Sequence, residues 1–560
     1  MRTRTVAFLA VAALGIGLPT PAVAKPHPIN ALIARMTLPE KVGQLFTTYV
    51  HGTAATTPSS DNKRLYGVDT PAEVVAKYHL GGVVYFSWTN SLQNPRQITT
   101  LSNGLQAASK KVPLMISTDQ EHGVVTRMPA PATRFPGAMA LGAGRDPAGA
   151  YRTGQVTGVE LRAVGIRQAW APVADVNVNP ANPVIGVRSF SSDPTLTGTL
   201  AANQIRGLQQ GAGISASAKH FPGHGDTATD SHTGLPVINH TRAQWQRIDA
   251  PPFRAAIAAG VDTIMSAHIV VPALDPTGDP ATLSNPIITG LLRGEFGYRG
   301  VIVTDSLEMQ GVREKYGDAR VPVLALKAGI DVLLMPPNLD VAYRAVLKAV
   351  ADGELTESRI DESVRRILTL KQKRGLLRWT PADPAAAQRI VGSAAHRRTA
   401  QSVTDRTVTV IRNDARLLPL ATKGKRILVT GWTSSTYDTI GVLARELTAT
   451  ALPTTVPDQA AAAAREHDLT VVLSNNGQQQ ALLAALLKTG KPIVVVAVRN
   501  PYDLTALPGV TTYLATYSYT DVSMRALAKV LTGVTPPRGR LPVAIPGLYP
   551  YGHGLSWGVK

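Results

Sequence analysis

The 560-residue chain contains no cysteine. Disulfide bonds, a thiol nucleophile, cysteine ligands for a metal ion and a lipidated amino-terminal cysteine are therefore all excluded. A chain of this size can be stable without disulfides, because 44% of its residues are hydrophobic and can fill a large core. The length is typical of two large domains or of three to four smaller ones.

Dense runs of Lys and Arg with interleaved aromatic residues are also absent, and the sequence has no nucleic-acid-binding motif. Nucleic acid is therefore not an expected partner. The charge balance of the chain is nevertheless basic, since 57 Lys and Arg residues against 38 Asp and Glu residues give a net charge of +19. In an exported protein this charge favours attraction to an anionic cell wall or extracellular polymer. The alternative is a basic, solvated surface without a specific partner.

Beyond its first residues the sequence has no apolar run of the roughly 20 residues that a membrane span requires. The first residues are typical of a secretory signal peptide. Two arginines precede a short apolar stretch at 6–18, prolines then interrupt it, and an A-x-A cleavage motif follows at 22–24. We expect residues 1–24 to be removed near Ala24 and the mature protein to be secreted, without a membrane span.

Residues 25–378 alternate between short apolar runs and amphipathic stretches, which predicts alternating strands and helices. Several runs are rich in Val and Ile, as strands buried on both faces of a parallel sheet are. The repetition favours an α/β fold of the (β/α)8 TIM-type barrel class, with an open doubly wound sheet as the alternative. The expected strands are 45–50, 82–86, 114–118, 168–173, 214–218, 263–267, 301–304 and 332–335, and the expected helices are 71–78, 95–110, 148–164, 194–210, 243–259, 287–295 and 318–328.

Charged residues directly follow several of these strands: Asp119, Lys219 with His220, His268 and Asp305. A single such residue is uninformative, since Asp commonly caps a following helix. In a barrel, however, these positions share the carboxyl-terminal rim, where active sites form. Their recurrence predicts a functional site at that rim.

A second, smaller domain is expected after the barrel. A helix at 357–373 closes the first domain (25–378), and the Pro- and Ala-rich segment 379–400 is predicted to be a linker with a helix. Between 401 and 560 strands alternate with Ala-rich helices, which indicates an αβα sandwich. The strands expected there are 407–411, 426–430, 469–473, 493–498 and 513–516.

The densest group of chemically active residues is the segment 219–232, KHFPGHGDTATDSH, whose proline and glycines predict a loop. A metal site is one interpretation, because His and Asp are common ligands. No further ligands accompany them, however, and Lys219 would repel a dication. A second interpretation is a loop held by local hydrogen bonds of His224, Asp226 and Thr227.

Proton transfer is a third interpretation, and it explains why Asp230 and His232 occur on one loop. A histidine held by a carboxylate has a fixed orientation and a stabilised imidazolium, so it can act as acid and base near neutral pH. Asp305 is the best candidate for its reacting partner. A lone carboxylate at a strand end is a suitable nucleophile for forming a covalent glycosyl-enzyme.

Together these motifs resemble glycoside hydrolase family 3, and within it the bacterial β-N-acetylglucosaminidases. The most specific motif is KHFPGHGDTATDSHTGLP at 219–236. The supporting motifs span both expected domains: MTLPEKVGQLF (36–46), STDQEHG (117–123), IGVRSFSSDP (185–194), MSAHIVVPALD (265–275), VIVTDSLEM (301–309), AGIDVLLMP (328–336), TVTVIRNDARLLPL (407–420), RGRLPVAIP (538–546) and YPYGHGLS (549–556).

The resemblance implies roles for particular residues. Asp305 matches the catalytic nucleophile. His232, paired with Asp230, matches a general acid/base that replaces the second carboxylate of most retaining glycosidases. No metal or cofactor is implied. The residues expected to bind substrate are Asp119, Arg127, Arg188, Lys219, His220 and His268.

Structural alternatives exist for two of these residues. His268 could equally be a core histidine with satisfied hydrogen bonds, and Arg127 could pair with Glu121. The sequence departs from the family at Val124, where the family often has arginine. Any pocket contact of that arginine is therefore missing here.

The predicted function is that of a retaining exo-β-N-acetylglucosaminidase acting on muropeptides of the cell wall or on chitin-type oligosaccharides. A β-glucosidase or β-xylosidase is an alternative that the Asp230–His232 pair disfavours. An N-acetylglucosaminide phosphorylase is another, because a histidine, unlike a carboxylate, does not repel phosphate. A non-catalytic glycan-binding wall protein is a further alternative, against which the intact Asp305 argues.

Overall fold

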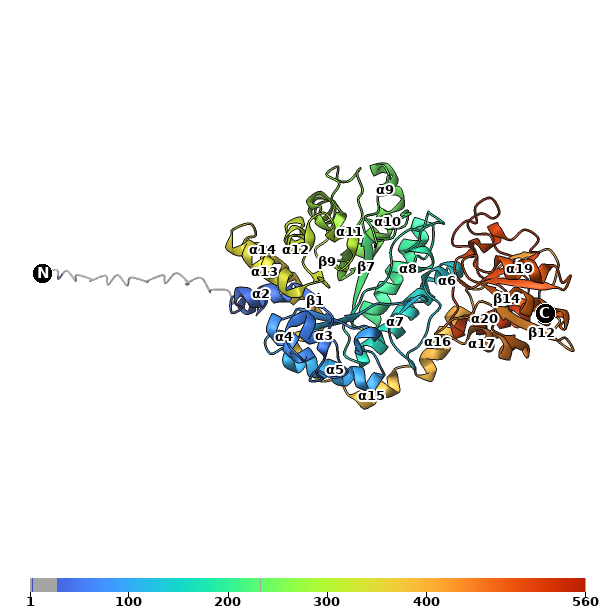
Figure 1. The fold of residues 1–560 in the computed structure, drawn as a ribbon. Coiled ribbons are helices and arrows are strands. Elements are labelled where there is room, and N and C mark those ends of the chain that lie inside the picture. The colour runs from blue at the N-terminus through green and yellow to red at the C-terminus, as the bar shows by residue number, and fades with distance from the viewer. Residues whose placement is uncertain (1–2, 4–27, 232, 559–560) are drawn as a thin grey trace.

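The computed structural model describes Thr3, residues 28–231 and residues 233–558. The predicted signal peptide, apart from Thr3, and the predicted acid/base His232 lie outside the described residues. The described chain forms a barrel domain, blue to yellow in Figure 1, and a second domain, orange to red, beside it. In the described ranges no helix is both long and apolar enough to cross a membrane.

Eight parallel strands form the barrel, which confirms the predicted (β/α)8 architecture over the doubly wound alternative. Their order is β10-β1-β2-β3-β6-β7-β8-β9, and a parallel bridge between Val303 and Val332 joins the two ends of this series. A short hairpin, β4–β5, follows β3. The strands of this domain are β1 (Phe46–Thr48), β2 (Gly82–Val84), β3 (Met115–Thr118), β4 (Gln120–His122), β5 (Val125–Thr126), β6 (Gln168–Ala169), β7 (Ser215–Phe221), β8 (Thr263–Ser266), β9 (Val301–Thr304) and β10 (Leu333–Leu334).

Helices surround the barrel, and capping residues determine where several of them begin (Figure 1). Thr70 and Glu73 form a capping box at the start of α4. Asp193 caps α8, whose first residue is Pro194. The α-helices up to the second domain are α1 (Pro28–Ile33), α2 (Leu38–Gln44), α3 (Ser60–Tyr66), α4 (Pro71–Tyr78), α5 (Pro95–Ala108), α6 (Ala138–Gly144), α7 (Pro147–Ala163), α8 (Pro194–Arg206), α9 (Arg242–Ile248), α10 (Ala250–Ala258), α11 (Gln310–Arg313), α12 (Gly317–Ala328), α13 (Leu339–Ala351), α14 (Glu357–Lys373), α15 (Pro384–Ile390) and α16 (Ala394–Thr404).

Three of the predicted helices differ from the observed ones. The helix expected at 243–259 is divided at Asp249 into α9 and α10, because two prolines follow Asp249 and begin a new helix. The helix expected at 194–210 changes at Gly207 into a π-helical segment that packs tightly on α7. The helix expected at 287–295 is also π-helical, spanning Pro286–Glu295.

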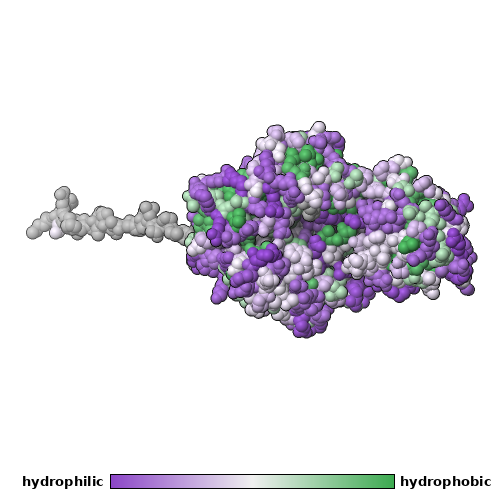
Figure 2. Space-filling view, in the orientation of Figure 1, coloured by the Kyte–Doolittle hydropathy of each residue, from purple (hydrophilic) through white to green (hydrophobic). Residues whose placement is uncertain are grey.

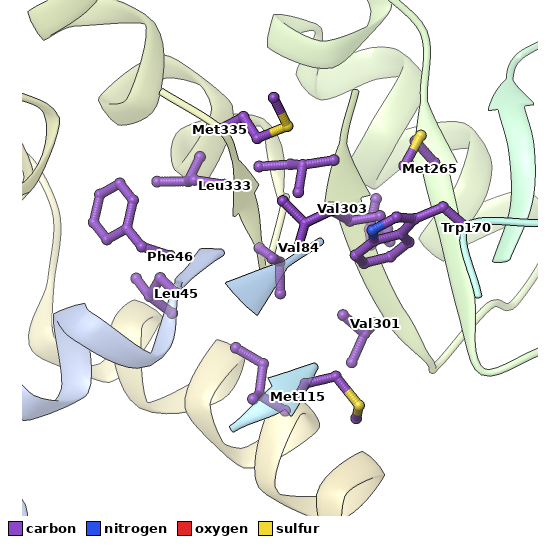
Figure 3. Close-up of a cluster of buried hydrophobic side chains, with 14 of the residues drawn as sticks. Leu45, Phe46, Val84, Met115, Trp170, Met265, Val301, Val303, Leu333 and Met335 are labelled. Carbon is purple, nitrogen blue, oxygen red and sulfur yellow. The ribbon is translucent and has the colours of Figure 1, made fainter. Parts of the chain in front are cut away.

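Apolar side chains of the strands fill the interior of the barrel (Figure 3). Val303 and Leu333 are fully buried there. Trp170, Met265 and Met335 lie at the carboxyl-terminal ends of strands, where they form the floor of a cavity. The interior is thus a packed core, and the space available to a ligand lies above it.

The second domain is a six-stranded sheet between helices, as predicted. Its strand order is β11-β16-β15-β14-β12-β13, with β11 antiparallel to β16 and the other pairs parallel. The edge strand β13 was not predicted, because its residues are largely exposed and not strongly apolar. The elements are β11 (Thr409–Asn413), β12 (Ile427–Gly431), α17 (Thr439–Leu447), β13 (Thr450–Leu452), α18 (Pro457–Arg465), β14 (Leu469–Ser474), α19 (Gln480–Leu487), β15 (Ile493–Ala497), β16 (Thr512–Ala515) and α20 (Asp521–Leu531).

Alternate side chains of the central strands face opposite layers of this domain. Val494 and Val496 of β15 share an apolar cluster with α17 and α20. Val495 and Ala497 share another with α18 and α19. Figure 2 shows hydrophilic residues over much of the visible surface of both domains, with hydrophobic patches scattered among them.

The two domains are joined by a shared apolar cluster and by backbone hydrogen bonds. Met139 of α6 and Val187, which follows β6, belong to the same cluster as the second-domain strands β14–β16. Arg540 N donates to Ala143 O at 3.0 Å, and Ser192 N donates to Pro542 O at 3.0 Å. The second domain therefore holds the long loop after β6, which also borders the cavity.

A buried charge cluster stabilises the opposite, amino-terminal end of the barrel. Asp331, which precedes β10, is fully buried. Its carboxylate accepts hydrogen bonds from Arg293 at 2.5 Å, Arg366 at 2.9 Å and Ser363 at 2.7 Å. Because these partners come from different elements, the carboxylate connects β10 to two outer helices.

We expect Asp331→Asn to lower the free energy of unfolding of the barrel by about 3 kcal/mol, because two arginines would lose their buried counter-charge. Asp352→Asn is the control. It removes an exposed partner of Lys348 and should change stability by no more than about 0.5 kcal/mol. Urea denaturation followed by tryptophan fluorescence measures both. Equal unfolding midpoints for the two variants would contradict the assigned role of Asp331.

Candidate functional site

A cavity of about 400 Å³ lies at the carboxyl-terminal ends of the barrel strands. Its floor is apolar, and most of its charged lining comes from the loops and strand ends that the sequence singled out. The candidate site residues that line it are Asp119, Arg127, Arg188, Lys219, His220 and Asp305.

An ion-pair network forms one wall of this cavity. Lys219 Nζ lies 2.7 Å from Glu121 Oε1 and 3.0 Å from Asp119 Oδ1. The Arg188 guanidinium donates two hydrogen bonds of 2.9 Å to the two carboxylate oxygens of Glu121. The wall is thus a rigid array of charges whose mutual positions are set before a ligand enters.

Burial and neighbouring charges act in opposite directions on these groups. Burial raises the pKa of the Glu121 carboxyl, but Arg188 and Lys219 outweigh burial and hold that pKa well below its usual range. Burial lowers the pKa of the Lys219 amine, and the Glu121 and Asp119 carboxylates reverse this and raise it. Glu121 and Lys219 are therefore both charged near neutral pH.

Glu121 is a residue that the sequence predictions did not assign to the site, although it lies two positions after Asp119. It does not pair with Arg127, because Arg188 and Lys219 occupy its carboxylate. The guanidinium carbon of Arg127 lies 5.6 Å from the centre of the Phe86 ring at the cavity wall. Val124, the departure from the family pattern, packs against the shared apolar cluster.

Asp175, which follows β6, is a second residue that was not predicted. Its fully buried carboxylate accepts hydrogen bonds from the backbone N of His220 at 3.0 Å and of His224 at 2.8 Å. It also lies 2.8 Å from His220 Nδ1. The signal was present in the sequence, since Asp175 follows an apolar run as Asp119 and Asp305 do.

β7 extends further than predicted, to Phe221, so Lys219 and His220 lie on the strand rather than in the loop after it. The strand continues because Lys219 pairs with Val173 and Phe221 pairs with Ser266 of β8. The Asp175 carboxylate also holds the backbone N of His220 there. His220 therefore faces the cavity with its Nε2 3.9 Å from Asp305 Oδ2.

Asp305 follows β9, and about 20% of its side chain is exposed to the cavity. Its Oδ1 accepts a hydrogen bond of 2.8 Å from the backbone N of Ser306. Burial raises the pKa of this carboxyl, but His220, His268 and Lys219 together hold it below its usual range. Asp305 is therefore an ionised carboxylate that faces the cavity, which is the state a nucleophile requires.

His268 lies beneath Asp305 rather than in the cavity lining. It is fully buried, and its ring nitrogens lie 2.8 Å from Thr282 Oγ1 and 2.9 Å from Ser306 O. Burial lowers its pKa. This arrangement matches the structural alternative for His268, and it places the ring as a support for the Asp305–Ser306 backbone.

The loop after β7 is held by His224. Its Nδ1 lies 2.9 Å from Thr227 Oγ1 and its Nε2 lies 2.9 Å from Ser231 Oγ. Burial, reinforced by the charge of His220, lowers the pKa of His224 to about 4. A neutral His224 therefore connects both ends of this loop, and Ser231 lines the cavity. Among the described residues, no group of three or more His, Asp and Glu side chains is arranged to hold a metal ion.

The loop has a second attachment at Asp226. The carboxylate of Asp226 lies 3.0 Å from His240 Nε2, and the buried Asp249 lies 2.7 Å from His240 Nδ1. The hydrogen bond with Asp249, above all, raises the pKa of His240. Asp230 accepts two backbone hydrogen bonds on its carbonyl, from Thr233 at 3.1 Å and Gly234 at 3.0 Å.

Comparison with known proteins matches both domains to one family. Residues 37–370 match the N-terminal domain of glycosyl hydrolase family 3, and residues 408–551 match its C-terminal domain. The chain is 33% identical over 553 residues to beta-hexosaminidase A of Pseudoalteromonas piscicida, which covers 85% of this chain and 90% of that protein.

Two solved structures have the same architecture. A glycoside hydrolase family 3 beta-N-acetylglucosaminidase from Paenibacillus is similar with a TM-score of 0.83 and 37% identity, over 91% of this chain and 99% of that one. A beta-glucoside phosphorylase is similar with a TM-score of 0.80 and 25% identity, over 92% and 95%. The predicted resemblance is confirmed. The chain is a glycoside hydrolase that has a barrel domain and an αβα sandwich domain, and it belongs to glycoside hydrolase family 3.

Proposed function

We propose that this protein is a retaining exo-β-N-acetylglucosaminidase that releases terminal β-linked N-acetylglucosamine from cell-wall or chitin-type glycans. The observation that carries the proposal is Asp305, an ionised carboxylate facing a cavity that is also lined by His224 and Ser231 of the loop that carries Asp230. The names of the beta-hexosaminidase and beta-N-acetylglucosaminidase relatives support the choice of sugar.

In the proposed first step Asp305 attacks the anomeric carbon, and the bond from that carbon to the leaving oxygen breaks. His232, assisted by Asp230, donates a proton to that oxygen. In the second step the same pair removes a proton from water, which displaces Asp305 and releases the sugar with retained configuration. His220, held by Asp175, lies beside Asp305 and stabilises its negative charge before the attack.

The charged wall is proposed to hold the terminal sugar. Asp119, Arg188 and Lys219 present oriented acceptors and donors to ring hydroxyls, and Arg127 and His220 complete the lining. Hydrogen bonds from a fixed array favour a ring with matching hydroxyls, since a mismatched ring would leave buried charges unpaired. The cavity ends on the packed core of the barrel, which supports action on a chain end.

Export is part of the proposal. The signal-like sequence at 1–24 and the net charge of +19 support a secreted enzyme that associates with an anionic cell wall. Phosphorolysis is a second candidate, favoured by the similarity to a beta-glucoside phosphorylase. Product analysis with and without phosphate separates the two, because phosphorolysis yields the sugar 1-phosphate.

We expect Asp305→Asn to reduce kcat for 4-nitrophenyl N-acetyl-β-glucosaminide by at least about a thousandfold, because an amide cannot form the glycosyl-enzyme. Release of nitrophenol measures the rate, and thermal unfolding checks that the variant is folded. The control is Asp352→Asn. Asp352 is exposed at the C-terminal end of the outer helix α13, and this substitution should leave kcat as in the wild type. Activity of Asp305→Asn within tenfold of wild type would contradict the nucleophile assignment.

We expect His240→Gln to reduce kcat for a disaccharide substrate more than kcat for an activated aryl glycoside. The ratio of the disaccharide kcat to the aryl glycoside kcat should fall about tenfold. The reason is that Asp226 would lose its attachment, the loop carrying Asp230 would be less well positioned, and only a poor leaving group requires strong proton donation. Parallel kcat measurements on both substrates give the ratio.

The matched control is His396→Gln. His396 also pairs with a buried carboxylate, Glu160, at 2.8 Å, but it lies on α16, away from the cavity lining. It should leave the ratio unchanged even if it lowers stability. An equal loss on both substrates in His240→Gln would indicate a general structural role and would count against positioning of the acid.

A further inference from the structure

A groove of about 440 Å³ lies between the two domains. Residues 180–188 of the barrel domain form one wall, and residues near 476–480 and 499–506 of the second domain form the other. Val184 and Arg188 line both the groove and the catalytic cavity. The groove therefore adjoins the cavity directly.

The walls of the groove are held at a fixed separation. Gly186 has a φ of 41°, and a Cβ at this position would lie 3.1 Å from Asn500 Oδ1, so the two domains approach closely there. Across the same loop, Asn177 Nδ2 donates to Tyr502 Oη at 3.4 Å. The shape of the groove thus belongs to the assembled two-domain chain and to neither domain alone.

The charge of the groove is unbalanced because of Arg499. Its Nε is buried without a hydrogen-bond partner, and among the described residues no carboxylate lies within salt-bridge distance of its guanidinium. The other arginine of the lining, Arg188, is paired with Glu121. The acidic residue of the lining, Asp503, accepts a hydrogen bond of 2.5 Å from Ser474 Oγ, and burial raises its pKa. Arg499 is thus an unpaired cation in a space that adjoins the catalytic cavity.

A partly buried cation without an ionic partner indicates the kind of ligand that the groove suits. A guanidinium forms its strongest hydrogen bonds with a carboxylate or another oxyanion. Asn500, whose side-chain oxygen is packed against Gly186, lies next to Arg499 in the lining. A ligand that carries a carboxylate, such as an acidic sugar, therefore suits the groove.

We infer that the groove binds the leaving-group part of the substrate, and that Arg499 of the second domain recognises a carboxylate on it. The inference rests on the proposed function. A chain end held in the cavity must continue through an adjoining space, and the groove is such a space. Free phosphate shares the oxyanion chemistry, and analysis of the products distinguishes it from a carboxylate on the glycan.

The test compares two disaccharides that differ only in charge: N-acetylglucosamine β-linked to N-acetylmuramic acid, and the methyl ester of the same disaccharide. We expect wild-type kcat/KM to favour the acid, and this acid-to-ester ratio to fall about tenfold in Arg499→Gln. Added NaCl should lower the ratio in the wild type, because salt screens the attraction. Arg499→Lys should retain part of the preference.

Arg465→Gln is the matched control, because it removes the same charge from an exposed position on α18, outside the groove lining. It should keep the wild-type ratio. The inference is overturned if the acid-to-ester ratio is near one in the wild type, or if Arg499→Gln leaves that ratio unchanged. It is also overturned if added phosphate accelerates turnover in an Arg499-dependent manner and the product is the sugar 1-phosphate. If Arg499→Gln fails to fold, the salt dependence of the wild-type ratio decides. Failure of the wild type on the 4-nitrophenyl substrate would instead refute the proposed function.

Discussion

The carboxylate of Asp175 is the interaction on which the arrangement of the site depends. It accepts hydrogen bonds from two backbone amides and one imidazole, all from the segment that ends β7 and begins the loop after it. A buried carboxylate needs such partners, because an unpaired charge in the interior is costly. By satisfying it, the chain fixes the end of the strand, the direction of His220 toward Asp305 and the start of the Asp230-bearing loop.

The charges around the cavity are arranged so that most have a partner within the protein. Glu121 lies between Arg188 and Lys219, and Lys219 also reaches Asp119. Such a network holds long side chains in one geometry, so a sugar meets donors and acceptors that are already oriented. Histidines in the same region differ in protonation, because their burial and their neighbouring charges differ. His224 is buried and neutral, whereas His240, between two carboxylates, has a raised pKa.

The long loop after β6 connects the chemistry to the second domain. It begins at the Asp175 carboxylate, carries Arg188 into the cavity wall and then forms hydrogen bonds with the segment near Pro542. The second domain is therefore part of the surroundings of the active site, although the catalytic candidates all lie on the barrel. The domain interface and the cavity share a wall, so the second domain borders the space into which a substrate held in the cavity would extend.

The sequence by itself determined the elements and the rim positions. Val- and Ile-rich runs predict buried parallel strands, amphipathic stretches predict helices such as α4 and α8, and charged residues after strands predicted Asp119, Lys219 and Asp305 in the cavity lining. These features are local, so a short stretch of chain contains them. The tertiary structure alone decided the partners: Asp175 holds His220 from 45 residues away, and Glu121 pairs with Arg188 from 67 residues away. It also placed His268 beneath Asp305 and Arg499 beside the cavity. The partner of a buried charge depends on which strand ends and loops become neighbours, and no local pattern specifies that.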